Sequence, residues 1–256
     1  MTGSPSTLCA AFDQGINFFF LSADMHWPLY ESARRGLRKL LERGRGIRDQ
    51  VVVGAVSYVA APEFCSAPFR ELLDAVPGLE RLDLLITGGA YASDFYPRLM
   101  PYQQHLRAGN FGARALGTTF HERPAAPLAI ARELIDIAFI RYNAAHPGAS
   151  EDLFPFLSAS SSTLVYNFKS ALPELTPARM EALGVGRDYW RPTVADHYRF
   201  VLTQPQLDGV LCALQTPRQV QALARALEQG PLDDEEQEHL LHLAALARAP
   251  TPPRRP

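Results

Sequence analysis

The sequence predicts an α/β protein folded as a parallel (β/α)8 barrel of the TIM type, incomplete at its N-terminus because the first strand is missing. Three observations carry this prediction. The chain has 256 residues, which suits a single barrel of this kind. Short apolar runs alternate with amphipathic segments at intervals of roughly 30 residues, which is typical of βαβ units. One run, residues 137–141, ends abruptly in polar side chains, as strands do at the mouth of a barrel.

Seven segments are expected as buried strands because they are short, apolar and rich in β-branched or aromatic residues. They are residues 16–21, 50–56, 82–87, 112–118, 137–141, 163–167 and 207–212. An eighth strand should precede them, but residues 1–7 are too polar to form one. Either the barrel has a gap, or a loop or partner fills it, or the reading frame has been assigned too short.

The segments between the strands are expected as helices, with apolar side chains on one face of each. They are residues 8–14, 31–44, 62–76, 96–108, 125–134, 152–157, 193–202, 217–228 and 233–247, with an irregular segment before Arg191. Residues 1–247 therefore form one barrel domain. Residues 248–256 are rich in proline and arginine, and we expect this tail to be disordered.

The bulk composition excludes several classes of protein. A net charge of -2 and a pI near 6.4 give no reason to expect nucleic acid as a partner. The three cysteines Cys9, Cys65 and Cys212 lack the spacing of a metal site or a disulfide framework. No apolar run approaches the ~20 residues needed to cross a membrane. We therefore expect a cytoplasmic protein that binds a small molecule, without a metal.

Polar side chains follow two neighbouring strands at the predicted mouth. His121 and Arg123 follow one strand, and Arg141, Asn143 and His146 follow the next. In one interpretation the arginines and the asparagine bind an anionic substrate while a histidine moves a proton. In the other, these side chains form a polar network that ties the βα loops together.

Several segments resemble the aldo-keto reductases, in the order found in that family. They are residues 10–19 (AAFDQGINFF), 106–117 (LRAGNFGARALG), 193–208 and 230–236 (GPLDDEE). Residues 141–149 and 191–200 look like a divergent bacterial branch of the family. The resemblance extends from residue 8 to about residue 247. It implies a (β/α)8 barrel, NADPH, and carbonyl reduction by hydride transfer, with tyrosine as proton donor beside aspartate, lysine and histidine.

The positions of that catalytic tetrad are replaced in this sequence. The aspartate falls on Phe20 and the tyrosine on Met25. The lysine falls on Val56 or Ser57, and the histidine on Thr87 or Gly88. Lysine and aspartate would normally lower the pKa of the tyrosine, so the proton must come from another group. His26 and Tyr30 follow the first expected strand, and either could donate the proton there. His26 is thus a candidate acid beside His121, with Trp27 as a substrate contact.

The cofactor positions implied by the resemblance are partly kept. Tyr166 matches the tyrosine that stacks on the nicotinamide, and Thr119 takes the place of a serine that holds the carboxamide. Arg218 remains from the loop that binds the adenosine phosphate, and Lys169 is a candidate phosphate contact. The glutamine that would contact the cofactor is replaced by Phe139.

Two functions therefore remain open. The first is a diverged oxidoreductase that acts on an unknown carbonyl compound with NADP(H), using His121 or His26 as the acid. The second is a catalytically inactive barrel, a pseudoenzyme that binds a ligand or a partner protein. A gap in the barrel would also leave unpaired strand edges, which a second copy of the chain or a partner could cover.

Overall fold

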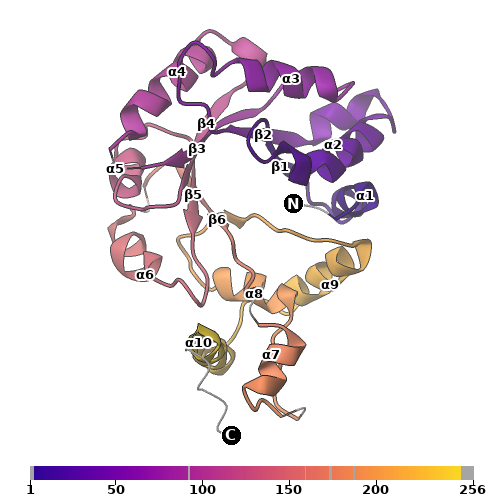
Figure 1. The fold of residues 1–256 in the computed structure, drawn as a ribbon, viewed down its shortest axis with the longest axis vertical. Coiled ribbons are helices and arrows are strands. Elements are labelled where there is room, and N and C mark those ends of the chain that lie inside the picture. Colours follow the sequence, from indigo (N-terminus) through magenta and orange to yellow (C-terminus); the bar gives the residue numbers. More distant parts are fainter. Residues whose placement is uncertain (1–2, 92, 159, 173–174, 187, 249–256) are drawn as a thin grey trace, which may run out of the picture.

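Each strand pairs in parallel with the next strand along the chain, so the sheet order is β1-β2-β3-β4-β5-β6-β7. The computed structural model describes residues 3–248 except 92, 159, 173–174 and 187. Within these residues the sheet curls into an incomplete barrel with the helices around its outside (Figure 1). The predicted fold is confirmed, including the missing strand, because β1 and β7 do not pair with each other.

The strands occupy nearly the predicted segments. They are β1 (Phe18–Ser22), β2 (Val52–Ser57), β3 (Leu84–Ala90), β4 (Ala115–Phe120), β5 (Ile137–Arg141), β6 (Leu164–Phe168) and β7 (Gly209–Val210). The last strand is shorter than the predicted 207–212. The N–H of Leu211 still donates to the Asn167 carbonyl of β6 at 2.8 Å, and the N–H of Ala213 then donates to the Tyr198 hydroxyl at 2.8 Å.

The helices also follow the prediction, with local differences. They are α1 (Pro5–Asp13), α2 (Trp27–Leu41), α3 (Ala67–Ala75), α4 (Phe95–Arg107), α5 (Ala126–Ala131), α6 (Ala149–Asp152), α7 (Pro177–Ala182), α8 (Val194–Val201), α9 (Pro217–Glu228) and α10 (Asp234–Arg248), with 3-10 turns η1 (Arg45–Gln50), η2 (Asn110–Gly112) and η3 (Phe154–Phe156). The segment expected to be irregular contains α7, which begins where the Thr176 side chain accepts from the Arg179 N–H. Of the expected tail, Arg248 ends α10, and 249–256 lie outside the described residues.

Three aspartates immediately before alternate strands repeat one contact. The carboxylate of each accepts a hydrogen bond from a backbone N–H of the preceding strand, and its own N–H donates to the carbonyl of the same residue. The pairs are Asp83 with Val53 (2.8 and 2.9 Å), Asp136 with Leu116 (2.7 and 2.8 Å) and Asp208 with Val165 (2.7 and 2.9 Å). This two-point contact fixes the register at the N-terminal ends of β3, β5 and β7.

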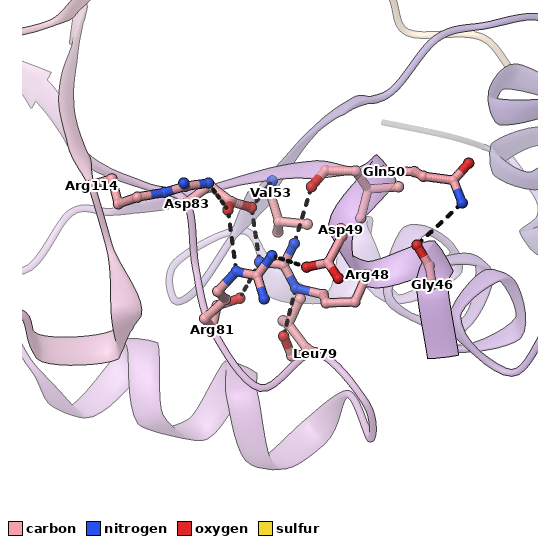
Figure 2. Close-up of polar contacts among 10 residues, drawn as sticks. Gly46, Arg48, Asp49, Gln50, Val53, Leu79, Arg81, Asp83 and Arg114 are labelled. Atoms are coloured by element: carbon pink, nitrogen blue, oxygen red, sulfur yellow. Dashed lines mark hydrogen bonds and ion pairs between the residues drawn. The ribbon is translucent and has the colours of Figure 1, made fainter. Parts of the chain in front are cut away.

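Arg48 anchors the first of these contacts (Figure 2). Its guanidinium donates to the carboxylate of Asp83 at 2.8 Å and to the carbonyls of Leu79, Val51 and Arg81 at 2.7 to 3.0 Å. Arg48 is 5% exposed and Asp83 is 7% exposed, so both charges are buried. Every contact of this guanidinium is to a charge or a carbonyl oxygen, which is what a buried arginine requires.

We expect Asp83→Ala to lower the free energy of unfolding by about 3–5 kcal/mol, because it leaves the buried Arg48 charge without its partner. Urea unfolding followed by circular dichroism measures this change. Asp49→Ala is the matched control, since Asp49 pairs with Arg81 in the same cluster but its side chain is 74% exposed. Equal stability of the two variants would show that the buried pair does not hold the sheet.

Candidate ligand-binding site at the barrel mouth

A cavity of about 990 Å³ opens at the carboxyl ends of the strands and continues down into the gap between β1 and β7. Its upper part is lined by side chains from the loops that follow the strands, among them His26, Tyr58 and His121. Its lower part is lined by apolar side chains of α1 and α9. The barrel interior beside it is filled by Phe18, Phe20 and other apolar residues, so the cavity is displaced towards the gap.

His121 lies at the mouth beside Phe168, with the two ring centroids 5.2 Å apart and the planes nearly perpendicular. Burial lowers the pKa of His121, and the nearby Lys169, Arg141 and His26 lower it further. The imidazole is therefore mostly neutral at pH 7. A neutral imidazole with a low pKa can donate an N–H to a ligand, and its protonated form is a strong acid for its class.

Lys169 holds an unusual backbone conformation directly after β6. Its φ angle is 57°, in the left-handed region that residues other than glycine rarely adopt. Asn143 fixes this conformation, because its side-chain amide donates to the Lys169 carbonyl at 2.7 Å. The sequence thus places a lysine where glycine would be less strained, and this lysine lines the cavity. Such strain is found where function requires a particular side chain.

Asn143 makes its contacts within the protein. Its side-chain oxygen accepts from the N–H groups of Ala145 and His146 at 3.0 and 2.9 Å, and the residue is 4% exposed. Its amide nitrogen is used by Lys169, as described above. The predicted substrate contact is thus placed where it positions the loop after β5 and, through it, Lys169.

Lys169→Gly should be more stable than Lys169→Ala by about 1 kcal/mol, because only glycine relieves the left-handed strain. Both variants remove the ammonium group, so the difference in stability between them reports the cost of the positive φ angle alone. Chemical denaturation of the two proteins, carried out side by side, measures the difference. Identical midpoints and slopes would mean that the φ angle at this position carries no strain.

The two predicted arginines of the mouth are held by other side chains. Arg123 makes a bidentate ion pair with Asp152, with both N–O distances at 2.6 Å. Arg141 contacts the ring of His146 through its terminal nitrogen. The Nε of Arg141 is buried and has no hydrogen-bond partner among the described residues. Both arginines thus make polar contacts with side chains that follow β5, and neither lines the cavity among the described residues.

The predicted cofactor residues lie at different depths. Thr119 lines the cavity, and its hydroxyl oxygen accepts from the Gly89 N–H at 2.8 Å. Tyr166 lines the cavity below the mouth, with its ring 5.7 Å from that of Phe18. Phe168, two residues further along β6, takes the position beside His121. Arg218 is exposed in the first turn of α9. Trp27 begins α2, but its side chain lies outside the described residues.

Tyr58 is a mouth residue that the sequence did not single out. Asp24 accepts hydrogen bonds from the Ser57 hydroxyl at 2.6 Å and from the Tyr58 N–H at 2.7 Å. The Tyr58 ring lies against the backbone of Gly88, where an added Cβ would come within 2.6 Å of it, and faces His26 with ring centroids 5.3 Å apart. The sequence contained one indication of this position, because the polar pair Ser57-Tyr58 ends an apolar strand, as residues at a barrel mouth do.

A second constellation, Cys65, His105 and Asn110, lies away from this cavity. The Cys65 sulfur is 3.3 Å from the Nε2 of His105, whose Nδ1 is 2.8 Å from the side-chain amide of Asn110. Cys65 is fully buried, and burial raises the pKa of its thiol. A substrate cannot reach this sulfur in the folded state, so the three residues act as a structural chain of polar contacts.

Comparisons with known proteins place the fold. Neither a protein-family model nor a curated protein sequence matches this chain. Among solved structures, an aldo-keto reductase of Bacillus halodurans in its holo form superimposes with a TM-score of 0.68 at 16% identity, over 98% of this chain and 88% of that one. The glycerol dehydrogenase of Gluconobacter oxydans gives 0.67 at 16% identity with the same coverage. The fold is that of the aldo-keto reductases.

A third structure agrees. An aldo-keto reductase of Brucella melitensis gives a TM-score of 0.64 at 12% identity, over 93% of this chain and 89% of that one. The segments that resembled this family in the sequence therefore predicted the fold correctly. Separately, none of the helices in the described part of the chain is both long and apolar enough to span a bilayer.

Proposed function

We propose that the protein is a diverged oxidoreductase of the aldo-keto reductase type that reduces a carbonyl compound with NADP(H). His121 is the proton donor in this proposal, and His26 is the second candidate. The observation that supports it most strongly is the position of His121 at the mouth, beside the Phe168 ring and close enough to Lys169 for its charge to lower the pKa of the imidazole, on a barrel shared with these reductases. The mouth of such a barrel is where its catalytic groups act.

The residues at the mouth suit a nicotinamide nucleotide. The Phe168 ring offers a flat apolar face, and the Thr119 hydroxyl keeps its hydrogen after accepting from Gly89. Lys169 at the mouth and Arg218 at the start of α9 are cations of the kind that bind phosphate groups. NADP(H), when bound, supplies the hydride. The protein has to orient the carbonyl group and deliver a proton to its oxygen.

The imidazoles are better proton donors here than the phenols. Burial, followed by the neighbouring Tyr58, raises the pKa of Tyr30 to about 12. Burial, followed by the charge of Asp24, raises the pKa of Tyr58 as well. Groups with raised phenol pKa values give up protons poorly near neutral pH, whereas His121 has a lowered pKa. Asp24 binds Ser57, which is one of the two positions where the resemblance places the lysine of the family, so no ammonium group is available there to acidify a phenol.

The direct test is a titration of the protein with NADPH, followed by the fluorescence of the cofactor. We expect saturable binding that weakens in Phe168→Ala, because the aromatic face is lost. Tyr91→Ala is a matched control, since Tyr91 also lines the cavity but is exposed. Absence of binding at millimolar NADPH would reject the reductase and favour a barrel that binds a ligand without catalysis.

His121→Ala should lower the turnover number for reduction of a carbonyl substrate at least about tenfold, as loss of a general acid does. In the unchanged protein, turnover should be highest at acidic pH and fall as the pH rises through a midpoint below 6.5, because the pKa of His121 is lowered. This fall in turnover with rising pH should be missing in His121→Ala. His242→Ala, on the exposed face of α10, is the control. A variant with unchanged turnover and an unchanged pH profile would exclude His121 as the acid.

A further inference from the structure

The lower part of the cavity has no part in the chemistry proposed above. It occupies the place between β1 and β7 where an eighth strand would lie. We call it the apolar slot, and define it by its lining residues Leu8, Ala11, Ile16, Leu214, Val220 and Leu223. α1 and α9 close it from outside, since the two helices pack against each other (Figure 1). The slot and the mouth form one continuous cavity.

The inner wall of the slot is aromatic. Phe18 and Phe20 of β1 point into the barrel on one side, and Tyr166 of β6 stands on the other. Gly209 of β7 allows this arrangement, because a Cβ at that position would come within 2.7 Å of the Tyr166 ring. The Tyr166 ring therefore packs directly against the backbone of Gly209. Aromatic and aliphatic walls of this kind suit a hydrocarbon chain.

The mouth end of the same cavity is positively charged. Its cation is Lys169, which lines it together with the imidazoles of His121 and His26, and no aspartate or glutamate occurs among the described residues that do. The other cation that lines the cavity, Arg98, is neutralised by Asp94 at 2.6 Å. The carboxylate of Asp24 is occupied by Ser57 and Tyr58. The cavity therefore has a cationic end without an acidic partner and a long apolar end.

We propose that this cavity binds an amphipathic carboxylate, with its head at Lys169 and an unbranched acyl chain in the apolar slot. Lys169 supports this assignment, because a residue with a strained, positive φ angle lines the mouth end of an otherwise apolar cavity and carries a positive charge. It is one of two lysines in the sequence, against 23 arginines. Charge complementarity selects a carboxylate over a peptide strand, whose backbone carries no charge for the ammonium group.

The size of the cavity agrees with such a ligand. Its volume of about 990 Å³ lies at the upper end of the roughly 300–1,000 Å³ range of small-molecule pockets, so a long acyl chain fits together with its head group. Binding of this kind requires no cofactor and no proton transfer. The proposal therefore stands or falls independently of the reductase activity.

The test uses the whole protein without NADPH. A fluorescent fatty acid, 11-(dansylamino)undecanoic acid, is bound first and then displaced by octanoate, decanoate and dodecanoate. Each added methylene should tighten binding about three- to fourfold until the slot is full. Dodecanol, which has the same chain without the charge, should bind at least about tenfold more weakly than dodecanoate. Affinity that does not depend on chain length, or equal binding of dodecanol, would overturn the proposal.

Two pairs of variants locate the ligand. Lys169→Ala should weaken dodecanoate binding at least about tenfold, while Lys39→Ala, the other lysine, should leave it unchanged. Leu227→Glu places a charge at the apolar end of the cavity and should abolish binding, while Leu241→Glu on α10 should not. Leu227 is 42% exposed, so its replacement leaves the fold intact, which circular dichroism verifies.

One further arm separates the acyl chain from a peptide occupant. An uncharged, strand-forming peptide of alternating valine and alanine is added to the probe complex. If the slot is an acyl-chain site, the peptide leaves the probe bound and the melting temperature unchanged. The opposite result would be that the peptide displaces the probe and raises the melting temperature of the protein, while dodecanoate leaves the melting temperature unchanged. This result would show that the slot binds a peptide strand, and it would overturn the proposal.

Discussion

The buried contact between Arg48 and Asp83 is the constraint on which the rest of the barrel depends. One carboxylate receives both the guanidinium and the backbone N–H of Val53, so the turn before β2, the strand itself and the start of β3 are held at one point. Arg81 and Arg114 approach the same carboxylate at 3.6 and 3.5 Å. Because Arg48 and Asp83 are both buried, removing either one would leave the charge of the other desolvated, and this cost favours the observed pairing.

The two ends of the barrel differ in how their polar groups are used. At the N-terminal ends of the strands, aspartates and Arg48 satisfy backbone groups and fix register. At the carboxyl ends, a lysine is strained, an arginine nitrogen lacks a partner among the described residues, and a histidine is held with a lowered pKa. The contacts at the N-terminal ends of the strands stabilise the folded state. The carboxyl-terminal end instead contains polar groups that are strained or have a shifted pKa, and such groups are typical of binding surfaces.

The sequence predicted the strands well and the individual contacts poorly. Apolar runs such as residues 137–141 depend only on burial, which local composition reveals. The bidentate pair between Arg123 and Asp152 joins residues 29 positions apart, and no local pattern marks it. The hydrogen bond from the Ala213 N–H to the Tyr198 hydroxyl, just after β7, joins residues 15 positions apart, and no local pattern marks it either. The strain at Lys169 is likewise invisible in the sequence, because it arises from Asn143 on a neighbouring loop.

The absence of pairing between β1 and β7 also changes the mechanics of the molecule. A closed ring of strands cannot widen unless a row of backbone hydrogen bonds breaks at once, so its bore is fixed. This ring is split, and across the split α1 and α9 meet through side-chain packing. Side-chain contacts can slide by fractions of an ångström at little cost, as in shear motions between packed helices. The distance between β1 and β7 is therefore set by side-chain packing of α1 against α9, and not by a row of backbone hydrogen bonds.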